Sequence, residues 1–264
     1  MKTLKYTFII LSTAILFTSC EKEIDLDLDE SEQLFVVEAI VHDNLGDNYV
    51  LLTKTRPYNN NGEIEKVSNA SVQISDNDGN TFRLNEVAPG FYTSNTLQGI
   101  ANKTYDLVIN AEGKTITASS FLNPRVAIDS LSQKQGEEAF WEDPNIPEYT
   151  VRCHFTDPGN KENFYRLKAF SAGVQEDGFL SLEDEFFNGN ATYFPIFDSD
   201  FFIGDSVTVQ LLSIDEVNHR YFTALTASQG GEVPGNPITN LEGDNAVGYF
   251  GAYAKSEESI IIVE

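Results

Sequence analysis

The sequence has no uncharged run long enough to cross a membrane as a helix, which takes about 20 apolar residues. Its opening uncharged stretch, Tyr6 to Thr18, has 13 residues and follows Lys2 and Lys5. A basic start, a short apolar segment and small residues before a cysteine are typical of a secretory signal peptide. Because Ser19 precedes Cys20 in the manner of a bacterial lipobox, we expect residues 1–19 to be removed and Cys20 to be lipidated.

Cysteine is scarce, with only Cys20 and Cys153 in the chain. If Cys20 carries lipid, Cys153 has no partner and no intrachain disulfide can form. Cys153 is followed by His154, but neighbours in a strand point to opposite faces and would not form a nucleophile pair. We therefore expect Cys153 to be a buried apolar residue, and the fold to depend on its hydrophobic core.

Basic residues are few: 17 Lys and Arg stand against 41 Asp and Glu, a formal net charge of −24. Loss of residues 1–19 would remove two lysines and no acid, making the chain more acidic still. Such a charge repels phosphate backbones and anionic headgroups, which excludes nucleic-acid binding. Membrane attachment must then come from acyl chains on Cys20.

Familiar catalytic motifs are missing as well. The chain contains no Gly-x-Ser-x-Gly, His-Glu-x-x-His or Gly-x-x-x-x-Gly-Lys sequence, which argues against the common hydrolases and nucleotide enzymes that carry them. Its three histidines, His42, His154 and His219, fall in three different predicted elements. They lack the clustered spacing of a zinc site.

Short alternating segments with turn residues between them fill positions 33–124. Asp78-Gly79 between two such segments predicts a tight hairpin, because glycine supplies the positive φ that the turn needs. About seven strands at this spacing predict an immunoglobulin-like β-sandwich, without the paired cysteines of antibody domains. Residues 20–32 are acidic and are read as a solvated tether, with a short edge strand as the alternative.

A composition change near Pro124 predicts a second, β-rich domain over residues 125–264. Strands are expected near 149–155, 164–170 and 206–212 from their alternation. One helix is expected near 213–229, because Ser213-Ile214-Asp215-Glu216 fits a capping box and Gly230 follows. Val217, Tyr221 and Leu225 would form its apolar stripe. The fold class is therefore mainly β, with two β-rich parts and one packed helix.

Aromatic residues crowd around Asn188-Gly189-Asn190, and aromatics among small polar residues often form contact surfaces. The alternative is that they fill a sheet core. The candidate ligand or partner contacts are Tyr193, Phe194, Phe197, Phe201 and Phe202.

Oxygen ligands for a calcium ion are available at Asp198, Asp200 and Asp205, although an acidic surface supplies such triplets by chance. A second acidic group, Asp76, Asp78 and Asn80, starts like a calcium loop but has Thr81 where glycine is needed. We interpret that group as part of the hairpin turn.

Several segments resemble known families. The pattern around Asn69-Ala70-Ser71-Val72, Asp78-Gly79 and Gly90-Phe91-Tyr92 resembles non-catalytic carboxypeptidase-regulatory-like sandwich modules. A wider set of segments, spread over nearly the whole mature chain, resembles the lipoprotein family catalogued as domain of unknown function 4249. That set is Cys20 with the acidic stretch from Ile24 to Asp29, the Asp78-Gly79 sandwich, Ile128-Asp129-Ser130-Leu131, Phe155-Thr156-Asp157-Pro158, and Gly248-Tyr249-Phe250-Gly251-Ala252.

The second resemblance implies a location and a partner but no catalytic residues. It implies an outer-membrane lipoprotein working beside a TonB-dependent receptor, and the acidic stretch after Cys20 resembles an export signal to the cell exterior. The leading hypothesis is a non-catalytic accessory that binds a ligand or partner in nutrient uptake. One alternative is an extracellular hydrolase of peptide or glycan that uses carboxylates such as Glu183, Asp184, Glu185, Asp198 and Asp200. Another is a structural or adhesive surface module.

Overall fold

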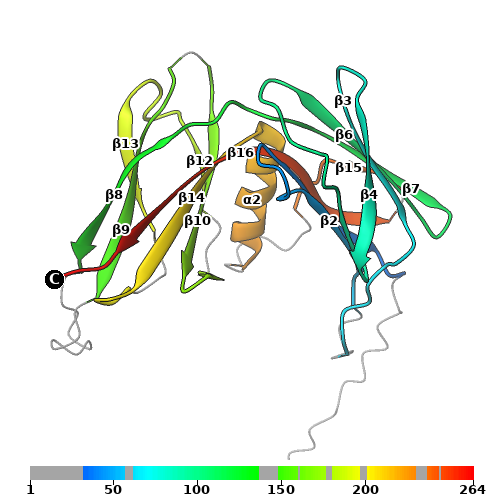
Figure 1. Ribbon diagram of the computed structural model, residues 1–264, viewed down its shortest axis with the longest axis horizontal. Coiled ribbons are helices and arrows are strands. Elements are labelled where there is room, and N and C mark those ends of the chain that lie inside the picture. Colours follow the sequence, from blue (N-terminus) through cyan, green and yellow to red (C-terminus); the bar gives the residue numbers. More distant parts are fainter. Residues whose placement is uncertain are drawn as a thin grey trace, which may run out of the picture. The chain divides into compact units, whose positions relative to one another are not determined.

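The computed structural model describes residues 32–56, 62–136, 148–159, 161–176, 180–196, 201–229, 237–243 and 245–264. Residues 33–264 form one compact unit. Its fold is mainly β with one packed helix (Figure 1), which confirms the predicted fold class. Cys20 and the tether lie outside the described residues.

The strands and the helix have the following bounds: β1 Phe35–His42, β2 Tyr49–Lys54, β3 Ser71–Asp76, β4 Thr81–Ala88, β5 Phe91–Thr93, β6 Thr104–Ala111, β7 Lys114–Phe121, β8 Ile128–Gln135, β9 Tyr149–Thr156, β10 Phe164–Ser171, β11 Val174–Gln175, β12 Leu180–Glu183, β13 Ala191–Pro195, β14 Ser206–Ile214, α2 Glu216–Gln229, β15 Leu241–Glu242 and β16 Ala246–Ile261.

Most strands belong to one continuous hydrogen-bonded path, in the order β11-β10-β14-β16-β1-β2-β5-β4-β3-β6-β7-β15, with β12 added to β10. Strands β1 to β7 form the N-terminal sandwich, and the hairpin at Asp78-Gly79 is confirmed by the antiparallel pairing of β3 with β4. A separate sheet, β13-β9-β8, covers the C-terminal part of the path and encloses a second core.

Strand β16 connects the two parts, as Figure 1 shows. Its first half pairs in parallel with β1, from Phe35↔Ala246 to His42↔Tyr253. Its second half pairs antiparallel with β14, ending at Ser206↔Ile261. Strands are usually about 5–6 residues long, whereas β16 has 16. Residues 246–254 therefore complete the sheet of the N-terminal sandwich, although they lie at the far end of the chain.

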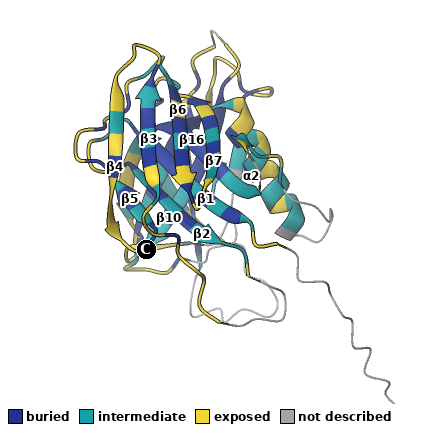
Figure 2. Ribbon diagram, turned by 90° about the vertical axis from the view of Figure 1, so that its right-hand side faces the viewer, coloured by how far each residue is buried: buried dark blue, intermediate teal, exposed yellow. Residues whose placement is uncertain are grey.

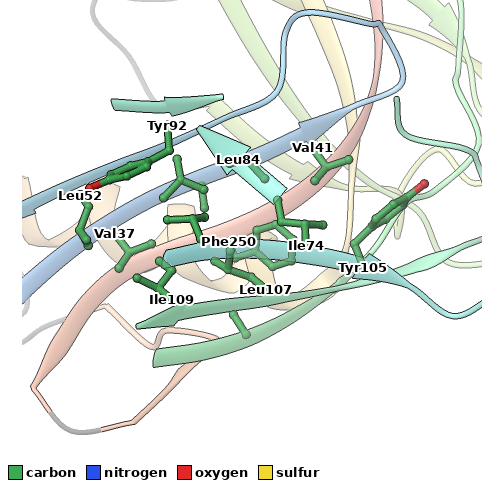
Figure 3. Close-up of a cluster of buried hydrophobic side chains, with 14 of the residues drawn as sticks. Val37, Val41, Leu52, Ile74, Leu84, Tyr92, Tyr105, Leu107, Ile109 and Phe250 are labelled. Carbon is green, nitrogen blue, oxygen red and sulfur yellow. The ribbon is translucent and has the colours of Figure 1, made fainter. Parts of the chain in front are cut away.

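The N-terminal core is built from the inward-facing residues of alternating strands. Val37 and Val41 of β1, Ile74 of β3 and Leu107 of β6 surround Phe250 of β16 (Figure 3). In Figure 2, dark-blue buried residues alternate along these strands with teal and yellow ones. Because successive side chains point to opposite faces, Tyr249 and Tyr253 lie on the other side of the sheet from Phe250.

Helix α2 packs on that other side. Its Phe222 is buried with Ile40, Leu212, Tyr249 and Tyr253 in a third apolar cluster. The predicted apolar stripe is only partly right: Tyr221 and Leu225 pack against this cluster, but Val217 is 39% exposed. The helix is rotated so that Phe222 and the polar Asn218 face the sheet instead.

The predicted cap at Ser213 is wrong, because β14 continues through Ile214 and the helix begins at Glu216. Asp215 is the N-cap: its Oδ1 accepts hydrogen bonds from the backbone N of Asn218 (2.9 Å) and from its Nδ2 (2.7 Å). The other oxygen, Oδ2, accepts from Ser120 Oγ (2.6 Å) and Phe121 N (3.1 Å) of β7. One carboxylate thus holds the helix to the N-terminal sandwich.

Replacing Asp215 with alanine should lower the free energy of unfolding by about 2–3 kcal/mol, since it removes a cap and leaves buried donors without acceptors. Urea denaturation followed by circular dichroism would measure the loss. Asp106→Ala, at an exposed position of β6, is the matched control and should change the midpoint little. Equal midpoints for the two variants would contradict this role of Asp215.

Candidate ligand-binding site

An open cavity of about 430 Å³ lies on the face of the long sheet that carries the third apolar cluster. Helix α2 covers the part of this face near Tyr249, and the cavity lies toward the other end of β1, at His42. We call it the His42 cavity. It is lined by His42, Gly46, Asp47, Asn48, Tyr49, Phe91, Thr93, Gln210 and Lys255.

The loop between β1 and β2 forms one wall of the cavity, and buried Asn48 holds it in place. The Oδ1 atom of Asn48 accepts a hydrogen bond from His42 N (2.6 Å), and its Nδ2 donates to Leu97 O (2.7 Å) and Asn44 O (3.2 Å). Thr93 Oγ1 donates to Asn48 O (2.8 Å). The wall is therefore fixed by hydrogen bonds that do not require a ligand.

An aromatic pair forms the floor. The rings of Tyr49 and Phe91 stack with their centroids 5.4 Å apart and their planes 24° from parallel. The Tyr49 hydroxyl donates to Glu38 Oε1. Burial and the neighbouring Glu38 carboxylate raise the pKa of Tyr49 far above its usual value. Tyr49 is thus a fixed, protonated side chain.

The charged groups at the rim are paired with one another. Lys255 Nζ lies 2.9 Å from Asp47 Oδ2 and 3.8 Å from Glu257 Oε2. Gln210 Nε2 donates to the same Glu257 oxygen (2.7 Å). Burial alone would raise the pKa of Asp47, but the hydrogen bond and charge of Lys255 outweigh it and lower that pKa.

His42 is the one lining residue with a buried polar atom left over. The side chain is 9% exposed, and its Nδ1 has no hydrogen-bond partner among the described residues. Burial, reinforced by the nearby Lys255 charge, lowers the pKa of His42 to about 4, so the ring is neutral at pH 7. A buried polar atom without a partner is uncommon in folded proteins, and this one has almost no surface accessible from the cavity.

Two further cations lie on the same face of β10. Arg166 stacks over Phe222, 3.7 Å from the ring centroid, beneath helix α2. Lys168, two residues along, pairs in register with Gln210. Burial and the charge of Arg166 lower the pKa of Lys168 to about 8. Neither residue lines the cavity, but Lys168 contributes to the potential at His42.

The aromatic residues predicted as contacts are divided between surface and core. Tyr193 is 48% exposed and lies under the Arg152 guanidinium, whereas Phe202 is 38% exposed in the turn before β14. Phe194 packs against the second core and Phe201 is buried inside it. Phe197 lies outside the described residues. None of the four described members of this set lines the His42 cavity.

Of the predicted calcium ligands, Asp205 is described, and Asp198 and Asp200 are not. Asp205 Oδ2 accepts from Phe202 N (2.8 Å) in a turn. In the described ranges, no group of three or more His, Cys, Asp or Glu side chains is arranged to hold a metal ion. The Asp76 carboxylate accepts from Asn80 N (2.9 Å) and Lys103 Nζ (2.7 Å), as expected of a hairpin turn.

Of the carboxylates considered for hydrolysis, Asp184 and Glu183 have structural partners and Glu185 is exposed. Asp184 is buried and accepts from Asn163 N (2.9 Å). Glu183 Oε2 lies 3.5 Å from His219 Nε2, and His219 Nδ1 is 2.7 Å from Ser181 Oγ. This serine–histidine–acid order can activate a serine. Here it links α2 to strand β12, whose backbone is paired with β10.

Cys153 is buried in the second core, and burial raises the pKa of its thiol to about 12. It is therefore an unreactive core residue, on the opposite face of β9 from His154, whose Nε2 is 2.7 Å from Ser132 Oγ.

No helix within the described ranges is long and apolar enough to span a membrane.

Sequence reasoning identified none of the cavity residues as a site. The lining residues come from β1, β2, β5, β14, β16 and the loop between β1 and β2. Beside the cavity, Lys255 N donates a hydrogen bond to Asp43 Oδ1, 212 positions away in the sequence. The one usable signal in the sequence is the polar, turn-like run from Asp43 to Asn48.

Comparison with known proteins gives a family and a similar solved structure. The family described as Domain of unknown function (DUF4249) matches residues 21–259. No curated protein matches the chain. Among solved structures, a two-domain fibronectin type III segment from chicken tenascin is similar over 67% of this chain and 88% of its own, with 12% identity and a TM-score of 0.22.

His42 is neutral in the folded protein and can be protonated in the unfolded chain. The free energy of unfolding should therefore fall on acidification. The contribution of His42 to the free energy of unfolding is fully present above pH 6.5. It falls by about 3 kcal/mol as the pH falls toward 4, for a pKa shift of this size. His42→Gln should show a shallower fall of unfolding free energy between pH 6.5 and 4. His154→Gln, at a less buried position, is the control. Parallel pH profiles for wild type and His42→Gln would contradict this account.

Proposed function

The chain belongs to the family of domain of unknown function 4249, and we propose that it is a non-catalytic binding protein that holds a small ligand in the His42 cavity. We further propose that it is anchored at the outer membrane through lipid on Cys20, faces the cell exterior, and serves a TonB-dependent receptor in nutrient uptake.

The observation that carries this proposal is an open cavity of about 430 Å³ whose wall is held by hydrogen bonds that do not require a ligand. Ligand sites in proteins are typically about 300–1,000 Å³, with aromatic walls and a few fixed polar groups. The Tyr49–Phe91 stack and the rim formed by Asp47, Gln210 and Lys255 have this composition.

The same lining favours binding over catalysis. A general acid or base works best with a pKa near the operating pH, and the pKa of His42 is about 4. Lys255 is paired with Asp47. The Thr93 hydroxyl donates its proton to a backbone carbonyl. The cavity thus offers groups that orient a ligand and no activated nucleophile.

Anchoring is supported by the sequence alone. Cys20 follows a short signal-like segment, and the acidic residues after it would extend as a charged tether. The net charge of −24 keeps the body away from anionic lipid surfaces, which leaves the binding face free for a partner.

The receptor part is tested by detergent extraction of native membranes carrying the chain with a C-terminal tag, followed by mass spectrometry of what co-purifies. We expect a TonB-dependent receptor in stoichiometric amount. Cys20→Ser is the control for anchoring and should release the protein from the membrane fraction. Recovery of the lipidated chain alone would overturn the receptor assignment.

The cavity part is tested by ligand capture. Purified protein is incubated with growth-medium extract, washed, denatured, and its retained small molecules are identified by mass spectrometry. Gln210→Trp should fill the cavity and abolish retention. Thr208→Trp, on the same face of β14 but outside the lining, should retain the same compounds as wild type. Identical retention by all three proteins would exclude the cavity as the binding site.

A further inference from the structure

We infer that the ligand of the His42 cavity is an uncharged sugar ring, held by apolar contact with the Tyr49–Phe91 pair and by hydroxyl contacts to Gln210, Lys255 and Asp47. This inference rests on the proposed function and adds to it the chemical class of the ligand.

The charge balance of the lining favours an uncharged ligand. Asp47 and Lys255 carry its two opposite charges and lie 2.9 Å apart, and His42 is neutral at pH 7. An anion would have to share Lys255 with Asp47 and approach a molecule of net charge −24. A cation would find one carboxylate that already holds an ammonium group. Burying an unpaired charge in either case is costly.

The aromatic floor favours a ring with an apolar face. Tyr49 and Phe91 stack on each other, and this aromatic pair lines the cavity. Aromatic rings provide a large, flat and rigid contact area. The C–H face of a sugar ring is flat and apolar enough to cover it, whereas a linear polyol or an amino acid would leave much of it exposed.

The polar rim matches hydroxyl groups. Gln210 uses its Nε2 to bond Glu257, and its Oε1 has no partner within the described ranges. Lys255 has three donor protons and two neighbouring carboxylates. A hydroxyl both donates and accepts, so adjacent sugar hydroxyls can bridge Gln210 Oε1, Lys255 Nζ and Asp47.

The rim also has room for a second ring. An added Cβ at Gly46 would meet no atom within 4 Å, so the loop is open at this point. Gly46 has a φ of 93°, a backbone conformation that residues with a side chain rarely adopt. A short oligosaccharide could therefore extend past this loop while one ring occupies the aromatic floor.

The test is a glycan array that carries neutral, uronic-acid, sulfated and sialylated glycans, probed with the wild-type protein at pH 7. Isothermal titration with the strongest glycan then compares wild type with variants. We expect binding to neutral glycans, weaker binding to their acidic counterparts, and about a tenfold loss of affinity for both Phe91→Ala and Gln210→Ala. Thr208→Ala and Phe121→Ala, outside the cavity, should bind as wild type. Melting temperatures show that each variant is folded.

Preference for acidic glycans, absence of any glycan binding, or an unchanged affinity in folded Phe91→Ala would overturn the sugar assignment. The capture experiment separates this failure from that of the proposed function. Compounds retained by wild type and lost in Gln210→Trp would preserve the binding site and change only its ligand class. No difference in capture together with no glycan binding would reject both.

Discussion

Strand β16 hydrogen-bonds to β1 along its first half and to β14 along its second, and the two β-rich parts of the chain depend on that shared backbone. Phe250 and Ala252 enter the N-terminal core, while Ile260 packs against the second core. Its glycines permit the close approach that this requires. A Cβ at Gly248 would lie 2.0 Å from Val37 O, and one at Gly251 would overlap the Tyr253 ring. A side chain at Gly248 would push β16 away from β1, and one at Gly251 would displace the Tyr253 ring of the same strand.

The two faces of β16 also have different roles. Alternate residues of β16 fill the two cores on one face, and the others, Tyr249, Tyr253 and Lys255, lie on the opposite face. On that second face, α2 covers the apolar residues around Phe222, and the His42 cavity occupies the part that α2 does not cover. A strand that holds the fold together thereby also contributes a rim residue to the proposed binding site.

Buried polar side chains stabilise these junctions in a chain whose described cysteine is unpaired. Asp215 caps α2 and accepts hydrogen bonds from β7. Asn218 donates to Phe250 O and accepts from the Tyr253 hydroxyl. Asn48 fixes the loop at the cavity. In each case one side chain satisfies several groups from distant segments, which fixes the relative position of those segments.

The sequence by itself determined the mainly β fold, the hairpin at Asp78-Gly79, the presence of one helix and the burial of Cys153, because alternation, turn residues and apolar pattern are local properties. Only the tertiary structure decided that Asp215 rather than Ser213 caps the helix, since this depends on how far β14 remains paired with β10. The cavity could likewise not be predicted from local sequence patterns. Residues such as His42, Phe91, Gln210 and Lys255 come together through strand pairings between distant segments, and no spacing along the chain records that proximity.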